Sequence, residues 1–372
     1  MAGRVRRTAT RLADGRELFY FDDTEPYVGG GAVRERHDTR RLPSAGAASE
    51  LRFDPLTGEW VVSASHRMDR TFLPDPADCP LCPTRPGRAA TEIPADDYDV
   101  VVFENRFPAL GPGGAVAGPV DGDPLWPRRP ATGRCEVVAF TADHDARFVD
   151  LSVARARTVF DALADRTAEL SAAPDVRQVF CFENRGAEIG VTLQHPHGQI
   201  YAYPFLPARS QVLVQRARAH HAATGRLLQR DVLEAERRAG TRIVWSGRRW
   251  TAYVPAAARW PIEVHLAPHR DVPDLAALDD AERDELAVAY RELLRRVDLF
   301  FDGVDRVPYI AAWHQAPVGD ERPYGRLFCQ IFSLRRAADK LKYLAGSESA
   351  MGVWISDTSA ERIAARLREL AG

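Results

Sequence analysis

The stretch that decides the fold is His195-Pro-His-Gly-Gln-Ile-Tyr201 (HPHGQIY), because an altered copy, Arg326–Phe332 (RLFCQIF), follows about 130 residues later. Glu136-Val-Val138, followed by Asp150 and a helical pattern, recurs at a similar spacing as Glu263-Val-His265, followed by Asp274 and a second helical pattern. A repeat of this period indicates one structural unit used twice. Each unit carries several strands and one helix, so the sequence predicts an α+β duplication whose antiparallel strands share one sheet.

Short apolar and aromatic runs bounded by Gly, Pro, Asn and Asp predict the strands. They lie at 100–103, 136–140, 179–182 and 199–203, with a hairpin within 53–63. Apolar residues at helical spacing predict helices at 151–170, with Ser152 as N-cap, and at 279–299. Residues 1–48 are rich in Arg, Asp and Gly without a sustained apolar period, so we expect a loosely attached N-terminal extension. The rest divides into domains 49–210 and 211–372.

The composition excludes several classes of protein. Fifty Lys and Arg against 52 Asp and Glu give a net charge of −2, so no basic field exists to hold nucleic acid. No apolar run approaches the roughly 20 residues that span a bilayer, so no membrane segment is expected. The first residues fit neither a secretory nor a transit peptide, and five cysteines do not suit a disulfide framework. These features predict a cytoplasmic protein.

Cys79-Pro-Leu-Cys82 is a Cys-x-x-Cys motif in a proline-rich turn. Two such thiolates can reach one tetrahedral zinc ion, which needs two further ligands. The other three cysteines are isolated in strand-like runs, so we expect histidines to complete the site. The alternative is a redox pair or two buried thiols, but no thioredoxin-like pattern surrounds the motif.

His195, His197 and Gln199 are spaced by two residues in an expected strand, so their side chains share one face. Neutral imidazole attacks phosphorus near pH 7 and departs readily, and a neighbouring carboxamide can hold a phosphoryl oxygen. Gly198 is expected to let a ligand approach the backbone closely. The alternative is that both histidines are metal ligands or core residues.

Several motifs together resemble the galactose-1-phosphate uridylyltransferase family, a branch of the histidine-triad superfamily. They are FENRGAEIG (182–190) with Thr192 and HPHGQIYA, and FDPLTGEWVVSASHRMDR, CPLC, VVFENRF, TADH and KLKYLAGSE, spread from about Leu51 to the C-terminus. The resemblance implies a duplicated histidine-triad-like fold, with a mixed, mostly antiparallel sheet forming a half-barrel and flanking helices. It makes the first domain catalytic and zinc-binding, and the second a degenerate repeat.

The resemblance also implies a double-displacement reaction. His197 resembles the nucleophile that takes UMP from UDP-glucose, releases glucose-1-phosphate and passes the uridylyl group to galactose-1-phosphate, giving UDP-galactose in galactose metabolism. Gln199 resembles the residue that binds the phosphoryl oxygens of the uridylyl-histidine. Cys79, Cys82, His144 and His195 resemble the ligands of one structural zinc ion.

The remaining carried-over positions are substrate contacts. Those resembling nucleotide and phosphate contacts are Asn105, Arg106, Asn184, Gly190, Val191 and Thr192, the last where a serine is common. Arg67 and Arg70 resemble arginines that reach a phosphate in the partner subunit's site. Hexose-side contacts, also shared across a homodimer, are implied for Lys342, Tyr343, Ser347 and Glu348.

The second copy departs from the family pattern. Well-known members have His-x-His there and bind iron with another histidine and a glutamate. This chain has Arg326 and Phe328 instead, and Leu213 lies near the glutamate position. Only His314 remains, so no second metal is expected.

Two alternative functions stay open. The first is a related nucleotide-sugar phosphorylase or nucleotidyltransferase with a different sugar or nucleotide, such as ADP-glucose. The second is a non-catalytic, zinc-stabilised binding protein. His197 and Gln199 argue against the second alternative, because neither is needed to bind zinc.

Overall fold

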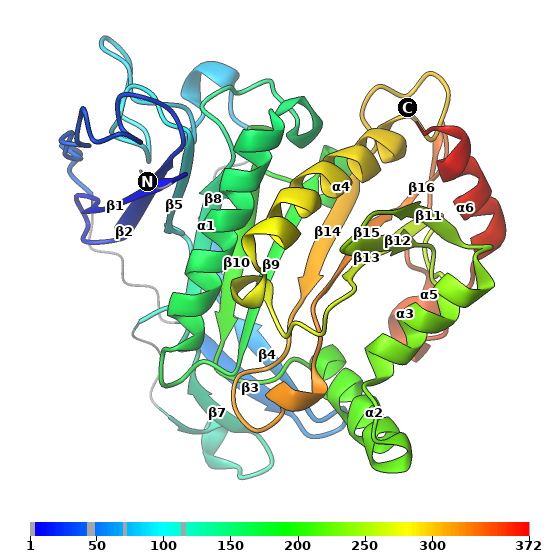
Figure 1. Ribbon diagram of the computed structural model, residues 1–372. Coiled ribbons are helices and arrows are strands. Elements are labelled where there is room, and N and C mark those ends of the chain that lie inside the picture. Colours follow the sequence, from blue (N-terminus) through cyan, green and yellow to red (C-terminus); the bar gives the residue numbers. More distant parts are fainter. Residues whose placement is uncertain (1–3, 43–48, 70–72, 113–116, 372) are drawn as a thin grey trace.

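The centre of the computed structural model, which describes residues 4–42, 49–69, 73–112 and 117–371, is one sheet of eleven strands (Figure 1). Its order is β1-β2-β5-β8-β10-β9-β14-β15-β13-β12-β11, and neighbouring strands run antiparallel. The strands are β1 (Arg6–Arg11), β2 (Glu17–Asp22), β5 (Val100–Glu104), β8 (Arg134–Ala139), β9 (Gln178–Arg185), β10 (His197–Tyr203), β11 (Ile243–Ser246), β12 (Trp250–Tyr253), β13 (Ile262–Pro268), β14 (Tyr309–His314) and β15 (Phe328–Ser333).

The strand order repeats about the middle of the sheet. Outward from the centre, one half reads β9, β10, β8, β5, β2 and the other reads β14, β15, β13, β12, β11, and β1 lies beyond β2 without a counterpart. Helix α1 (Val153–Ser171) follows β8 in the chain, and helix α4 (Asp280–Asp298) follows β13. The α+β class and the shared antiparallel sheet predicted from the repeat are confirmed.

Helices α1 and α4 lie side by side on one face of the sheet (Figure 1). Both predicted helices are present, and each begins at a polar cap. Ser152 Oγ accepts a hydrogen bond from Arg155 N at 3.0 Å, and Asp279 forms a reciprocal capping box with Glu282. Their apolar faces form the main core with the sheet, and in that core Phe160 and Tyr290 meet edge to face at 5.5 Å.

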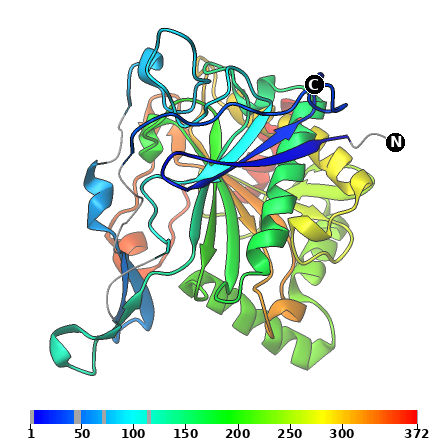
Figure 2. The same cartoon turned by 90° about the vertical axis from the view of Figure 1, so that its left-hand side faces the viewer.

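The opposite face of the sheet carries the polar residues of β10. Ile200 and Ala202 are buried in the core beneath α1, whereas His197, Gln199 and Tyr201 are only half-buried on the other side. A small sheet with the order β4-β3-β7-β6 lies on that side (Figure 2). It contains the predicted hairpin and comprises β3 (Glu50–Asp54), β4 (Glu59–Ser63), β6 (Gly118–Pro119) and β7 (Pro127–Pro130).

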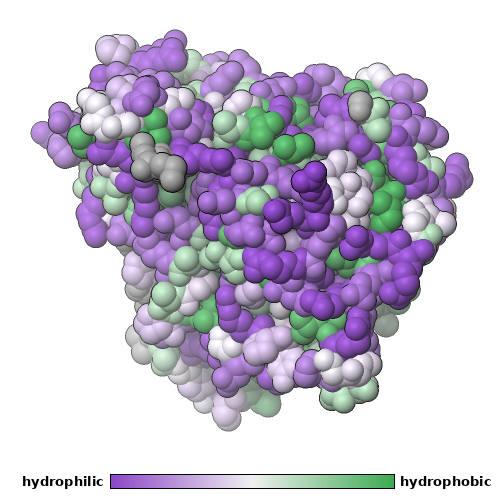
Figure 3. Space-filling view, in the orientation of Figure 1, coloured by the Kyte–Doolittle hydropathy of each residue, from purple (hydrophilic) through white to green (hydrophobic). Residues whose placement is uncertain are grey.

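The second half carries further elements at its rim (Figure 1). They are α2 (Ala208–Thr224), α3 (Leu228–Ala239), β16 (Arg335–Ala337), β17 (Lys340–Leu341), α5 (Gly346–Met351) and α6 (Ala360–Glu369). Within the ranges described, no helix combines the length and the apolar character that a membrane crossing requires. The face seen in Figure 3 is mostly hydrophilic, with apolar residues in separate patches.

Residues 6–22 differ from the loosely attached extension that the sequence suggested. They form the β1–β2 hairpin, which pairs with β5 and extends the main sheet. The apolar run Leu18–Phe21 is fully buried. Phe19 and Phe21 join the core beneath the helices, and Leu18 and Tyr20 join a core on the other face. The expectation of a loosely attached extension was wrong for these residues. The apolar run is only four residues long and stands among charged residues, so no sustained apolar period is visible in the sequence.

Candidate active site

A cavity of about 150 Å³ lies beside β10 on the face away from α1; we call it the His197 cavity. Its wall combines apolar side chains with arginines and amides. The lining residues are Arg67, Pro80, Leu81, Glu92, Phe103, Asn105, Arg106, Phe107, Val137, Thr192, Leu193, His197 and Gln199. The fold therefore gathers six predicted site residues, from four separate segments, around one cavity.

His197 is oriented by the backbone of its own strand. Its Nδ1 lies 2.7 Å from the carbonyl oxygen of His195. A carbonyl only accepts hydrogen bonds, so Nδ1 carries the proton and the lone pair is on Nε2. Burial lowers the pKa of His197 below its usual range, which favours the neutral ring. A neutral imidazole with a free Nε2 can act as a nucleophile.

The register of the sheet places Gln199 beside His197 on the same face. Gln199 is opposite Phe182 of β9 and Val137 of β8. Gly198 points the other way, into the core. A Cβ atom at this position would lie 3.0 Å from both the Phe140 ring and the Phe182 carbonyl oxygen. Core packing therefore leaves little room for a side chain here, and the approach of a ligand to the Gly198 backbone stays a prediction.

A second cavity of about 240 Å³ adjoins the first and shares His197 and Leu193 with it. Asn184 and Val191 line this second cavity. Gly190 does not line either cavity; with φ at 78° it ends the short 3-10 turn Ala187–Ile189, a conformation that favours glycine. His197 thus stands at the boundary between two spaces.

Four of the predicted residues form a candidate metal centre. One ligand atom each from Cys79, Cys82, His144 and His195 lies within 4.8 Å of all the others. Cys82 Sγ is 3.5 Å from His144 Nδ1 and 3.6 Å from His195 Nδ1. Sulfur and nitrogen ligands on a tetrahedral zinc ion would be about 3.5 Å apart. The predicted grouping of these four residues is confirmed, and it could hold a metal ion.

Two residues outside the predicted set orient His195. Its Nε2 lies 2.8 Å from the Thr141 carbonyl oxygen and 3.0 Å from the Tyr98 hydroxyl, which itself donates to the Leu81 carbonyl at 2.8 Å. Such outer contacts fix the ring and leave Nδ1 facing the other ligands. Sequence reasoning missed Tyr98, because its partners are distant in the chain and no motif marks it.

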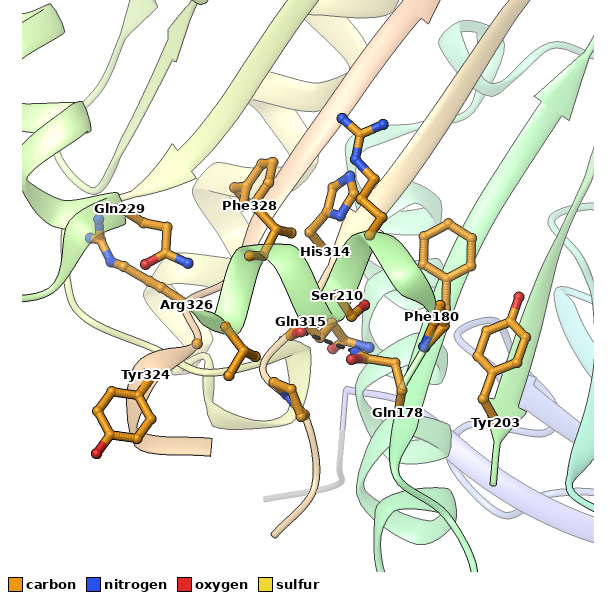
Figure 4. Close-up of a pocket in the computed structure, with 16 residues that line it drawn as sticks. Gln178, Phe180, Tyr203, Ser210, Gln229, His314, Gln315, Tyr324, Arg326 and Phe328 are labelled. Atoms are coloured by element: carbon orange, nitrogen blue, oxygen red, sulfur yellow. Dashed lines mark hydrogen bonds between the residues drawn. The ribbon is translucent and has the colours of Figure 1, made fainter. Parts of the chain in front are cut away.

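The second half has a different cavity, of about 160 Å³, between α2 and the sheet (Figure 4). Arg326 is buried there and donates to the Pro268, His269 and Arg270 carbonyls. The Phe328 ring stacks on the His314 ring at 4.5 Å, and Leu213 also lines this cavity. Of the four family positions, only His314 offers a metal-ligating atom. The absence of a second metal stays a prediction.

The remaining predicted residues lie elsewhere. Lys342 and Glu348 form a buried ion pair at 3.1 Å, the Ser347 hydroxyl donates to the Val353 carbonyl, and Tyr343 is exposed. None of these four lines either cavity that contains His197. Arg67 lines the His197 cavity of its own chain. Arg70 lies outside the described residues.

Comparison with known proteins supports the resemblance in both halves. The N-terminal domain model of galactose-1-phosphate uridyl transferase matches residues 41–207, and the C-terminal domain model matches residues 213–371. A Streptomyces lividans galactose-1-phosphate uridylyltransferase is 47% identical, covering 99% of this chain and 98% of the relative. The Thermotoga maritima enzyme is 34% identical, covering 86% of this chain and 98% of its own length.

Solved structures agree. A uridylyltransferase structure superposes with a TM-score of 0.77 at 32% identity, covering 86% of this chain and 98% of its own. An ADP-glucose phosphorylase from Arabidopsis thaliana shares the fold, with a TM-score of 0.63 at 21% identity, covering 87% of this chain and 98% of its own. The matched domain models, the near full-length relative and the shared fold make this chain a member of the galactose-1-phosphate uridylyltransferase family.

Proposed function

We propose that this chain transfers a uridylyl group from UDP-glucose to galactose-1-phosphate through a covalent intermediate on His197. Membership of the family supports the substrate pair. One structural observation carries the mechanism: the bond from His197 Nδ1 to the His195 carbonyl leaves the Nε2 lone pair as the reactive group.

The proposed reaction has two balanced displacements. Nε2 attacks the α-phosphorus of UDP-glucose, the phosphorus–oxygen bond to glucose-1-phosphate breaks, and glucose-1-phosphate leaves with the bonding electrons. A phosphate oxygen of galactose-1-phosphate then attacks the same phosphorus, the nitrogen–phosphorus bond breaks, and UDP-galactose leaves. The backbone bond at Nδ1 holds the ring in one orientation through both steps.

The polar residues around His197 suit a negatively charged group. Gln199 would donate to a phosphoryl oxygen beside the nucleophile, and Thr192 offers a hydroxyl. Arg67 and Arg106 can bind phosphate oxygens through paired N–H groups. In the adjoining cavity, Asn184 would act on the same substrate. Fixed donors of this kind stabilise developing charge without reorganising.

We assign zinc to the candidate metal centre. Two thiolates and two imidazoles are the ligands that zinc prefers, and four protein ligands make a closed, structural site. The ion would connect the Cys79–Cys82 turn and His144 to His195, which lies two residues before the start of β10. Because His195 is two residues from His197, this connection would also fix the nucleophile. No second, iron site is part of the proposal.

The proposal includes the organisation of the molecule. Two histidine-triad-like domains, 49–210 and 211–372, would form a half-barrel from their joint sheet. The repeated strand order supports two halves, the first of which also takes in the β1–β2 hairpin. A homodimer would bring the partner's hexose-side residues, Lys342, Tyr343, Ser347 and Glu348, to the His197 cavity. The cytoplasm suits five cysteines of which none forms a disulfide.

The test is a labelling experiment with UDP-glucose that carries a radioactive α-phosphate, without acceptor. We expect acid-labile, base-stable label on the wild-type chain, and its transfer to added galactose-1-phosphate. His197→Asn should take up no label. His221→Asn, an exposed histidine on α2, is the matched control and should label normally.

Other outcomes would redirect the assignment. Label from ADP-glucose but not from UDP-glucose would favour the related nucleotide-sugar phosphorylase, in which His197 works identically. A folded, metal-loaded chain that takes label from no nucleotide sugar would favour the binding-protein alternative.

A further inference from the structure

The N-terminal hairpin contacts the wall of the His197 cavity through Arg16. This residue lies just before β2 and is 3% exposed. Its guanidinium donates through Nε to Asp14 at 2.7 Å, through Nη1 to the Glu104 carbonyl at 2.8 Å, and through Nη2 to Glu92 Oε2 at 2.6 Å. Arg16 therefore links the hairpin to Glu92, a residue that lines the cavity.

A second arginine from the same N-terminal segment binds the other oxygen of Glu92. Arg40 Nη1 donates to Glu92 Oε1 at 2.9 Å, while its Nε and Nη2 hold Asp38 at 2.8 and 2.7 Å. Each oxygen of the Glu92 carboxylate thus accepts a short, charge-assisted hydrogen bond from an N-terminal arginine. Glu92 itself is 5% exposed, so it depends on these partners.

Arg106 faces the same carboxylate from the cavity side. Its Nη1 is 3.7 Å from Glu92 Oε1, which is too long for a hydrogen bond, and its side chain is 41% exposed. The contact is therefore a long ion pair that leaves the N–H groups of Arg106 able to bind a ligand. The shorter bonds from Arg16 and Arg40 satisfy Glu92, so the donors of Arg106 stay available in the cavity.

We propose that the N-terminal hairpin and the segment that follows it, to Arg40, belong to the nucleotide site. Arg16 and Arg40 are positioning residues that neutralise Glu92 and leave Arg106 free to bind the phosphates of the nucleotide sugar. The inference rests on the proposed function, because it assumes that the nucleotide occupies the His197 cavity. Without the two arginines, the nearest cation to the buried Glu92 carboxylate on the cavity side would be Arg106. Arg106 would then form a close ion pair with Glu92. Its guanidinium would no longer be available, and the Glu92 carboxylate would repel the anionic ligand.

Glu92 and Arg106 lie within the part of the chain that the family's N-terminal domain model matches, which begins at residue 41. Arg16 and Arg40 both precede it. The Streptomyces relative, which covers 99% of this chain, aligns with the hairpin as well.

The experiment compares the full-length wild type with the Arg16→Met/Arg40→Met double variant. We expect the Kd for UMP, measured by calorimetric titration, and the KM for UDP-glucose to rise about tenfold. The kcat and the KM for galactose-1-phosphate should stay within about twofold, because His197 and Gln199 are untouched. Arg11→Met, an exposed arginine on β1, is the matched control and should change neither constant.

A suppressor variant separates positioning from folding. Adding Glu92→Gln to the double variant removes the carboxylate that would capture Arg106, so UMP affinity should return to within about twofold of wild type. The proposal is overturned if UMP affinity stays weak in this triple variant. It is also overturned if kcat and both KM values worsen together with a lower melting temperature, because the hairpin would then only stabilise the fold. Unchanged UMP affinity in the double variant would overturn it too.

The two hypotheses fail in different ways. If the wild type takes no label from UDP-glucose, the proposed function is wrong whatever the arginine variants do. If the wild type labels normally and the Arg16→Met/Arg40→Met variant has the wild-type KM for UDP-glucose, only the role of the hairpin is wrong.

Discussion

Glu183 lies directly across from Gly198 in the sheet, on the side away from His197. Two tyrosines hold its carboxyl group: Tyr309 donates to Oε1 at 2.6 Å and Tyr290 to Oε2 at 3.2 Å. Burial raises the pKa of Glu183 to about 7, because the charged form loses its hydration there. This residue therefore changes charge in the core near neutral pH.

The raised pKa of Glu183 predicts a pH-dependent stability. Between about pH 4.5 and 7 the native chain holds a proton that the unfolded chain has released, so the free energy of unfolding falls as pH rises through this window. Glu183→Gln cannot ionise. Between pH 5 and 8 its free energy of unfolding should therefore fall by up to about 3 kcal/mol less than that of the wild type. Urea unfolding at each pH measures the difference.

The exposed Glu59→Gln is the control for Glu183→Gln and should follow the wild-type curve. Parallel pH curves for wild type and Glu183→Gln would show that Glu183 does not titrate in this range.

Tyr98 predicts an effect on metal affinity. Tyr98→Phe removes the hydroxyl between His195 Nε2 and the Leu81 carbonyl, so the ring is less well oriented. Loss of such an outer contact weakens metal binding about 10-fold or more. Competition with a zinc-binding dye measures the affinity, and Tyr343→Phe, an exposed tyrosine, is the control. Equal zinc affinity in Tyr98→Phe and wild type would contradict this role.

At the scale of elements, β10 has two faces with separate tasks. The face with His197 and Gln199 lines the candidate active site, and the face with Gly198 and Ile200 packs in the core. Sequence alternation predicted the first face correctly. It could not assign Gly198, because the Phe140 ring that fills the space comes from the end of another strand.

Gly198→Ala tests this assignment. A Cβ atom would be overpacked against Phe140 and the Phe182 carbonyl, and such overpacking costs about 1–3 kcal/mol. We expect that loss in the free energy of urea unfolding, with the covalent labelling per folded molecule retained. Gly346→Ala, where no atom lies within 4 Å of the added Cβ, should be neutral. Normal stability with lost labelling would instead mean that the ligand contacts Gly198.

At the scale of the whole molecule, the residues proposed to contact the hexose line neither cavity that contains His197 within one chain. The same segment exposes a group of large apolar side chains: Tyr343, Leu344, Met351, Val353 and Ile355. Apolar patches of this kind mark protein–protein interfaces. The patch supports the proposed homodimer.

We therefore expect a mass in solution of twice the 41.3 kDa of one chain, measured by sedimentation. Met351→Asp with Val353→Asp should yield monomers, because two charges would be buried at the interface. Val212→Asp, at an exposed position on α2, should remain dimeric. A wild type that sediments as a monomer at the concentrations used for assay would contradict the dimer.

The sequence by itself determined the duplication, helices α1 and α4, and the quartet of Cys79, Cys82, His144 and His195. The duplication and the helices depend on local periodicity, which is legible along a single stretch of chain. The quartet followed from the family resemblance, and the structure brings its four members together. The face shared by His197 and Gln199 was predicted for the same local reason as the helices.

Only the tertiary structure decided the place of the N-terminal hairpin, the partner of Tyr98 and the packing role of Gly198. The bond from Arg16 to Glu92 joins residues 76 positions apart, and that from Tyr98 to His195 joins residues 97 apart. Such contacts depend on how strands pair across the sheet and leave no local pattern. Short-range periodicity determines where helices and strands form. Which charged groups and hydroxyls become buried, and with which partners, depends on distant segments coming together.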